Sequence, residues 1–258
     1  MKKWKAVAGY EIGTSHQKQG IGCQDYGNYR ILDDVIVGAV ADGAGSAKHS
    51  DVGSRLAVET VVKCFSEINE LPQKQPFSQP LDKEEAQKVF AKIVNQVITQ
   101  LQKQADEEDY FINDLACTLL VFVATHDWLA AMQIGDGFIL ARSQDSEHQL
   151  LFQPDKGEFA NETTFITSAN AVKQMQVKVI HEKQEFICAS TDGLEKVAIR
   201  LSDWEPFSPF FKPLEEYLHE PVNPEDEDKY LMEFLNSERL NSRTDDDKTL
   251  LLCLFDRE

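Results

Sequence analysis

Short apolar runs rich in β-branched residues alternate with polar turns along much of this chain, a pattern typical of β-strands. We expect strands at residues 6–12, 26–32, 35–41, 116–125, 128–134, 138–142, 186–191 and 248–255, with a further strand-forming piece at 163–167. The run at 35–41 contains no polar side chain. It therefore predicts a buried strand.

Two longer segments place their apolar residues at helical spacing instead. The first begins at Ser50 or Asp51, either of which can cap it, and its stripe reaches Phe65. The second spans residues 84–105, and a shorter helix is expected at 226–240. The stripes predict packing against a sheet. Between these elements we expect a polar loop at 13–22, a linker at 71–80 and an acidic loop at 106–109.

Strands and helices come in blocks along the chain and not in a repeated strand-helix-strand order. Two antiparallel sheets packed face to face, with the helices outside, fit this order, so the predicted fold class is α+β. A chain of 258 residues with 42% hydrophobic content is long enough for one substantial core. We therefore expect one domain over residues 1–258, with a helical decoration around 205–243.

The buried run at 35–41 ends at a carboxylate, Asp42, and small residues follow it. If Asp33 and Asp34 form the turn of a hairpin, its two strands place Asp25 opposite Asp42. Two carboxylates held this close are costly unless a cation lies between them. The hairpin thus predicts a cation site at one end of a sheet.

A similar pair of strand ends occurs further along the chain. The run at 186–191 ends at Asp192, and Asp246 lies among three aspartates that precede the run at 248–255. If these two strands are antiparallel neighbours, their carboxylates meet at one end. Four carboxylates can then converge, those of Asp25, Asp42, Asp192 and Asp246.

A fifth carboxylate is a further candidate for the same place. A hairpin formed by residues 116–125 and 128–134 returns Asp136 towards the end at which Thr118 lies. Hard divalent cations prefer oxygen ligands, so an aspartate cluster suits Mg²⁺ or Mn²⁺ better than Zn²⁺. No cluster of histidines and cysteines in the sequence competes with that assignment.

The charge balance excludes two classes of partner. The net charge is −18, from 26 Lys and Arg against 44 Asp and Glu, and this field repels nucleic acids and anionic membranes. No apolar stretch is long enough to span a bilayer, and no apolar signal segment follows the basic start. The five cysteines are scattered, as in a reduced protein. We therefore expect a cytoplasmic protein.

Five short motifs follow one another along almost the whole chain: Gln24-Asp25, Ala41-Asp42-Gly43, Ile134-Gly135-Asp136, Ser190-Thr191-Asp192-Gly193-Leu194 and Asp246-Asp247-Lys248-Thr249. Their order and spacing resemble those of the metal-dependent protein phosphatase 2C family. The Cys23-Gln24-Asp25-Tyr26 run and residues 158–163 are most similar to its divergent, mostly bacterial branch. The resemblance implies a four-layer α-β-β-α sandwich with two Mg²⁺ or Mn²⁺ ions at one edge.

The resemblance also implies a set of metal ligands. Asp42 would bridge both ions, and Gly43 would offer its backbone carbonyl to one of them. Asp192 and Asp246 would hold the other ion. Asp246 is preferred to its two aspartate neighbours because the family has a Thr or Ser three residues after the ligand, and Thr249 fits that position.

Three further positions follow from the same resemblance. Gln24 falls where many members have a metal-linked glutamate, and Asp25 falls on the adjacent acidic position that supports the metal waters. Asp136 corresponds to an acidic residue that helps bind a third metal in bacterial members. Against a third metal, the acidic residue expected four positions after Asp192 is Lys196, although Glu195 is adjacent.

The chain departs from the family at the positions expected to contact phosphate. The family's phosphate-binding arginine is replaced by Gly20, and no histidine follows Asp42 where some members have a proposed general acid. The usual flap sequence between Asp136 and Asp192 has no clear counterpart. Phosphate charge could instead meet one of three side chains, those of Lys18, His16 and Arg30.

We therefore expect a metal-dependent protein serine/threonine phosphatase in which a water activated by two ions attacks phosphorus, with Asp42 and Asp25 as the most sensitive positions. The substrate would be a phosphorylated protein, opposed by a serine/threonine kinase in bacterial signalling, and the enzyme a monomer. Two alternatives remain: a phosphatase-like module that binds a phosphoprotein with little turnover, which Gly20 and Lys196 motivate, and a phosphatase acting on a small metabolite.

The other potentially reactive side chains are expected to be structural. Cys188 is predicted to be a packed core thiol, because no phosphate loop of the Cys-x5-Arg type surrounds it. Five histidines are expected at the surface or in loops: His49, His126, His148, His181 and His219.

Overall fold

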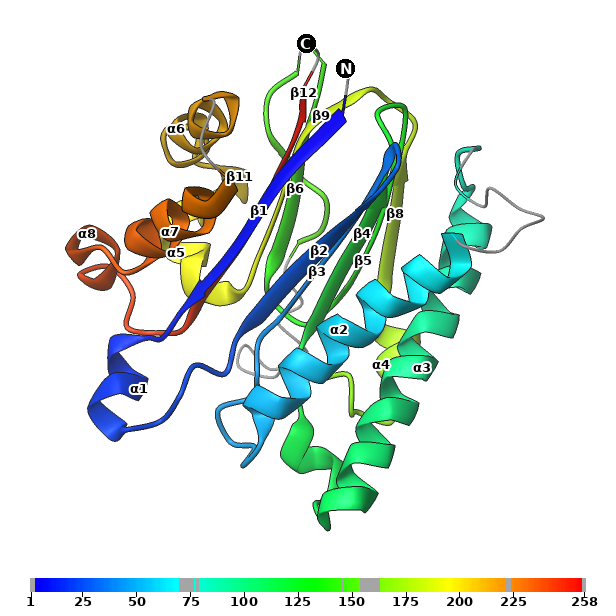
Figure 1. The fold of residues 1–258 in the computed structure, drawn as a ribbon, viewed down its shortest axis with the longest axis vertical. Helices are drawn as coiled ribbons and strands as arrows, with labels where there is room; N and C mark the ends of the chain where they lie inside the picture. The colour runs from blue at the N-terminus through cyan, green and yellow to red at the C-terminus, as the bar shows by residue number, and fades with distance from the viewer. Residues whose placement is uncertain are drawn as a thin grey trace.

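The computed structural model describes residues 3–69, 77, 79–144, 146–153, 163–220 and 224–256. Two five-stranded antiparallel sheets lie face to face, with helices on both outer sides (Figure 1). The first sheet has the order β1 (Lys3–Glu11), β12 (Lys248–Asp256), β9 (Gln184–Ser190), β6 (Phe138–Ser143) and β7 (Gln149–Leu150). The second has the order β2 (Tyr26–Leu32), β3 (Val35–Ala41), β4 (Leu119–Ala124), β5 (Leu129–Ile134) and β8 (Gln176–Ile180). The predicted α+β class is confirmed.

The strand β3 is apolar at every position because both of its faces are buried. Ile36 and Val40 point into the core between the sheets, where they join Phe122 of β4 and Leu251 of β12. Val37 belongs to the other core, under the helices. Alternate side chains of this strand therefore pack into two separate apolar layers.

Two long helices cover the outer face of the second sheet (Figure 1). They are α2 (Ser50–Asn69) and α3 (Lys83–Glu108). The helix α3 begins with a capping box, because Asp82 accepts a hydrogen bond from the Glu85 N–H and Glu85 accepts one from the Asp82 N–H. The helix α2 begins at Ser50, where its start was predicted, but within the described residues the Ser50 hydroxyl has no hydrogen-bond partner and so does not cap it.

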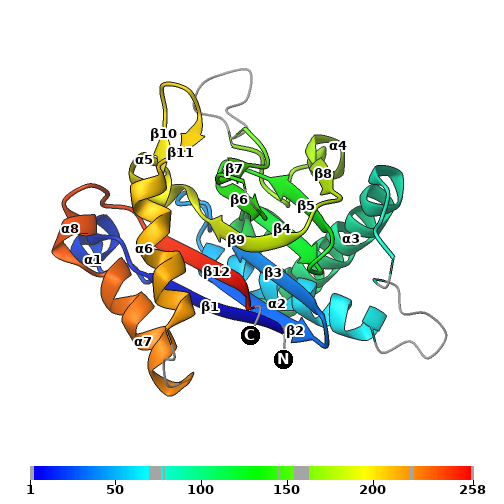
Figure 2. The same cartoon turned by 90° about the horizontal axis from the view of Figure 1, so that it is seen from above.

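Shorter helices cover the outer face of the first sheet (Figure 2). They are α5 (Glu195–Ala198), α6 (Ser208–His219), α7 (Pro224–Leu235) and α8 (Glu238–Asn241), with a small ribbon of β10 (Ile199–Arg200) and β11 (Glu205–Pro206) beside them. Two short helices, α1 (Thr14–Gln19) and α4 (Ala171–Gln174), lie in connections. The first sheet thus has its own helical layer, which completes the order α-β-β-α.

Four expectations about local structure are wrong. The segment 226–240 is broken into α7 and α8, because Ser237 caps a new helix by accepting the Leu240 N–H. The acidic residues 106–108 continue α3, and only Asp109 leaves it, in a left-handed conformation. Residues 163–167 form no strand, and the strand lies at β8 instead. The polar loop at 13–22 contains the helix α1. Apart from residues 77, 79 and 80, the predicted linker at 71–80 lies outside the described residues.

Each of the five cysteines is a free thiol, and four of them are buried. In the described part of the chain, no helix combines the length and the apolar character that crossing a membrane requires.

Candidate active site

The predicted hairpin brings two aspartates to one end of the second sheet. In the register of β2 and β3, Leu32 pairs with Val35 and Tyr26 pairs with Ala41. Asp25 and Asp42 are the next residues outward, so they leave the sheet side by side. The Asp42 backbone is fixed by Thr118, which accepts the Asp42 N–H on its hydroxyl at 2.9 Å and donates its own N–H to the Asp42 carbonyl at 2.8 Å.

The first sheet brings two more aspartates to the same end. Ser190, the last residue of β9, pairs with Leu250 near the start of β12, so Asp192 and Asp246 lie at neighbouring strand ends. The hydroxyl of Thr191 donates to Asp25 Oδ2 at 2.6 Å and accepts the Thr249 N–H at 3.1 Å. One side chain therefore ties the two sheets together at the site.

These four aspartates, which we call the carboxylate cluster, interact strongly. Burial raises the pKa of Asp25 and of Asp192 to about 7. Burial, and then the neighbouring charges of Asp25, Asp192 and Asp246, raise the pKa of Asp42 well above its ordinary value. The Asp42 side chain lies close enough to those of Asp25 and Asp192 to affect the pKa of both. Carboxylates held this close repel one another when ionised, so their approach favours a bound cation among them.

The donor set of this cluster fits a hard divalent cation. Two buried oxygens, Asp25 Oδ1 and Gln24 Oε1, have no hydrogen-bond partner within the described residues. Such orphaned acceptors are costly unless a ligand takes them up. Across residues 3–69, 77, 79–144, 146–153, 163–220 and 224–256, no three His, Cys, Asp or Glu side chains surround a single ion position as they stand.

Glycine is required beside Asp42. A Cβ at Gly43 would lie 2.7 Å from the Gln24 carbonyl oxygen and 2.8 Å from Ser50 Cβ. This close approach lets the Gly43 N–H donate to that carbonyl at 3.1 Å. The loop after Asp42 is thereby held against the segment that carries Asp25.

Asp136 lies at the edge of the cluster. Its charge contributes to the raised pKa of Asp192, and its Oδ2 accepts a hydrogen bond from Thr163 at 2.5 Å. The preceding Gly135 has a φ of +111°, and a Cβ there would meet the Thr118 side chain. Asp136 therefore returns to the Thr118 end of the sheet, where the second hairpin was expected to bring it.

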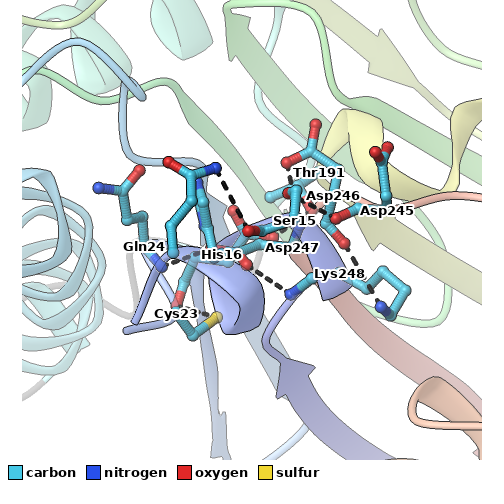
Figure 3. Close-up of polar contacts among 12 residues, drawn as sticks. Ser15, His16, Cys23, Gln24, Thr191, Asp245, Asp246, Asp247 and Lys248 are labelled. Carbon is cyan, nitrogen blue, oxygen red and sulfur yellow. Dashed lines mark hydrogen bonds and ion pairs between the residues drawn. The ribbon is translucent and has the colours of Figure 1, made fainter. Parts of the chain in front are cut away.

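Asp247 is a residue of the site that the sequence did not reveal. It is buried, and its carboxylate accepts the N–H groups of Gly13 and Gln24, each at 2.6 Å. His16 Nδ1 lies 3.0 Å from the same carboxylate (Figure 3). Asp247 therefore fastens both ends of the segment that carries α1 to the start of β12, next to Asp246. Nothing in the sequence of three adjacent aspartates shows which one accepts these backbone N–H groups and which one joins the carboxylate cluster.

The structure separates the three side chains expected near phosphate. Arg30 pairs with Val37, four residues along the strand from the Asp25 end, which is about 13 Å away at the usual rise per residue. It lines an open groove with Glu59 and Lys63 instead. Lys18 is exposed, whereas His16 is held at Asp247.

His148 lies in the loop before β7, where loop histidines were expected, but its burial was not foreseen. His148 is buried, and its Nε2 lies 3.0 Å from Glu215 Oε1, between the first sheet and α6. Cys188 is a packed thiol, as predicted, and burial raises its pKa well above the ordinary value, so it cannot serve as a thiolate nucleophile.

Comparisons with known proteins agree with this arrangement. A family model for protein phosphatase 2C matches residues 12–236. The serine/threonine-protein phosphatase 3 of Escherichia coli (strain K12) is 32% identical over 264 residues, which cover 98% of each chain. The solved structure of the S. agalactiae serine/threonine phosphatase has a TM-score of 0.65 at 16% identity, over 98% of this chain and 100% of its own.

A further solved structure, that of RsbX in complex with magnesium, has a TM-score of 0.56 at 12% identity, over 99% of this chain and 100% of its own. At these identities the two structures establish the fold, and the family match with the E. coli relative establishes the kinship that the motif series implied. This chain therefore belongs to the protein phosphatase 2C family, as a serine/threonine phosphatase of the bacterial type.

Proposed function

We propose that this phosphatase hydrolyses phosphoserine and phosphothreonine in proteins by means of two Mn²⁺ or Mg²⁺ ions held at the carboxylate cluster. The observation that supports the proposal is the convergence of four aspartates whose negative charges repel one another. Beside them lie two buried oxygens that have no hydrogen-bond partner in the described residues. Such a cluster needs cations to remain ionised at neutral pH.

The ligand roles follow from position. Asp42 lies centrally, between Asp25 and Asp192, and would contact both ions. The Gly43 carbonyl would complete one oxygen shell, and Asp192 with Asp246 would hold the second ion. Gln24 would add its unpartnered Oε1 to the first. When bound, two such ions lower the pKa of a water between them and withdraw charge from the phosphate.

The protein side chains then orient the reactants. Asp25 is fixed by Thr191 through Oδ2, which leaves Oδ1 free to accept a hydrogen bond from the attacking water. Asp136 is occupied by Thr163 and lies next to Asp192, where it would support the second ion rather than hold a third. No side chain is required as a nucleophile, so no covalent intermediate forms.

The wider setting is also a proposal. A serine/threonine kinase would generate the substrate, because a phosphoprotein phosphatase consumes what such a kinase makes. The five free thiols fit a reducing compartment such as the cytoplasm. Residues 1–258 would act as one domain and as a monomer, since the exposed large apolar side chains of the described residues belong to separate elements.

The test is hydrolysis of p-nitrophenyl phosphate and of a phosphothreonine peptide, with and without Mn²⁺. We expect turnover of both substrates that needs Mn²⁺ and falls by at least about a hundredfold in Asp42→Asn, because loss of a ligand to both ions removes the activated water. Full Mn²⁺-dependent turnover by Asp42→Asn would contradict the mechanism. Metal binding without turnover by the wild type would favour a phosphoprotein-binding module, which Lys196 motivates.

A further inference from the structure

The imidazole of His16 is fixed beside the carboxylate cluster by a buried carboxylate. Asp247 Oδ2 accepts the Gln24 N–H at 2.6 Å and lies 3.0 Å from His16 Nδ1, so the same oxygen joins the ring to the segment that leads into Asp25 (Figure 3). Asp247 also follows Asp246 directly in the chain. His16 therefore lies between two strand ends that supply the cluster.

Only one ring nitrogen of His16 is used by this contact. His16 Nδ1 lies within hydrogen-bond distance of Asp247. Nε2 is therefore the ring nitrogen that can contact a ligand. The side chain is 16% exposed, so the ring is largely enclosed but still reachable from solvent. An ordering contact to a carboxylate is the usual way in which a protein fixes the orientation of a functional imidazole.

Two other cationic side chains near the site, those of Lys248 and Arg55, are directed elsewhere. Lys248 is buried, and its Nζ donates to Asn241 Oδ1 at 3.0 Å and to the Asp246 carbonyl at 3.3 Å. The Arg55 guanidinium lies over the Tyr26 ring, 4.8 Å from its centroid. Tyr26 packs in the helix-covered core, and successive side chains of a strand point to opposite faces, so Arg55 lies on the other face from Asp25.

We propose that His16 donates a hydrogen bond from Nε2 to an oxygen of the bound phosphate, and that Asp247 is the positioning residue that holds the ring for this contact. The proposal rests on the phosphatase function proposed above. Because the Asp247 carboxylate accepts from Nδ1, donation from Nε2 uses the ring with a proton on both nitrogens, and the phosphate would lie on the side of the ring away from Asp247. No bond to phosphorus is made or broken by His16, which takes its proton from solvent and keeps it.

The first test compares the wild type with His16→Ala in Mn²⁺. The variant should fold normally, because α1 has no buried side chain. Loss of one charge-assisted hydrogen bond should raise the inhibition constant of inorganic phosphate about tenfold and raise KM for p-nitrophenyl phosphate by a similar factor. The kcat should stay within about twofold, because ground state and transition state lose the same contact.

Lys18→Ala is the matched control, since it removes a positive charge from an exposed position of the same helix. It should leave the phosphate inhibition constant unchanged. An inhibition constant that rises equally in both variants would show a general charge effect and overturn the proposal. An unchanged constant in His16→Ala would overturn it as well, while Mn²⁺-dependent turnover would still uphold the phosphatase function.

The role of Asp247 is tested by a double-mutant cycle. Asp247→Asn should raise the phosphate inhibition constant in the wild type, and the same change should have little further effect on it in His16→Ala, because the ring that it positions is gone. Additive effects would overturn the positioning role. Calorimetric titration of inorganic phosphate into the Mn²⁺-loaded proteins repeats the comparison without turnover. If the wild type is inactive, the proposed function is contradicted, but the phosphate affinities still show whether His16 contacts phosphate.

Discussion

Thr191 illustrates how single residues shape this site. Its hydroxyl donates to Asp25 Oδ2 from the end of one sheet and accepts the Thr249 N–H within its own sheet. It is 1% exposed, so neither bond has water as a ready substitute. The distance between the two pairs of aspartates thus depends on a residue that carries no charge.

Replacing this hydroxyl has a predictable cost. Thr191→Val keeps the shape but leaves the Asp25 oxygen and the Thr249 N–H unsatisfied, so we expect a loss of about 1 to 3 kcal/mol in the free energy of unfolding. Thr191→Ser keeps the hydroxyl and serves as the control. Urea unfolding of the metal-free proteins measures the difference, and equal stabilities of the two variants would refute the bridging role.

At the scale of elements, the two sheets approach closely where β3 lacks a side chain. A Cβ at Gly38 would lie 2.5 Å from Leu251 Cδ2 of the facing sheet and within the same distance of the Phe122 ring. The inner residues of β3 and β12 therefore interlock around this glycine. The spacing of the sheets in turn sets the spacing of the strand ends that carry the aspartates.

Filling this position should push the sheets apart. We expect Gly38→Ala to lower the free energy of unfolding by about 1 to 3 kcal/mol through overpacking. Gly22→Ala is the control, since nothing lies within 4 Å of a Cβ there. The two variants are compared by urea unfolding. A Gly38→Ala protein as stable as the control would show that the sheets have room between them.

At the scale of the whole molecule, stability is linked to pH through the carboxylate cluster. The folded protein raises the pKa of Asp25 and Asp192 to about 7, whereas the pKa of an aspartate in the unfolded chain is about 3.9. A group whose pKa is higher in the folded than in the unfolded state stabilises the native protein, and this stabilisation is complete at pH values below the unfolded pKa. That stability is lost as the pH rises through the folded value.

The melting temperature of the metal-free protein should therefore fall between pH 5 and pH 8, by roughly 5 °C or more. Mn²⁺ should raise it more at pH 8 than at pH 5, because ions replace the protons. Asp42→Asn removes one ionisable group and should flatten the fall. A wild-type melting temperature that falls over this range no more steeply than that of Asp42→Asn would be inconsistent with the coupled carboxylates.

The fold and the main acidic residues of the site could be predicted from the sequence, because each depends on local signals. The turn at Asp33 and Asp34 fixes the register of one hairpin, and register places Asp25 beside Asp42. Asp192 followed from a strand end, and so did the row of three aspartates that faces it, within which the family resemblance selected Asp246. Helical periodicity likewise located α2 and α3 to within a few residues.

The remaining features depend on contacts between distant parts of the chain. Asp247 is separated from Gly13 by 234 positions, and nothing in a row of three aspartates tells which side chain points inward. His148 is buried because Glu215, 67 residues away, offers it a partner. Thr191 acquires its role only when two sheets meet. Such pairings follow from the packing of whole layers, which no short motif encodes.

The most direct measurement of the central claim is the number of Mn²⁺ ions bound per chain. Equilibrium dialysis of the metal-free protein against Mn²⁺ at pH 8, followed by metal analysis, should give two ions per chain for the wild type and at most one for Asp42→Asn, which should keep its native circular dichroism. Equal binding by both proteins, or no ion bound by the wild type, would contradict the assignment of the carboxylate cluster as the metal centre.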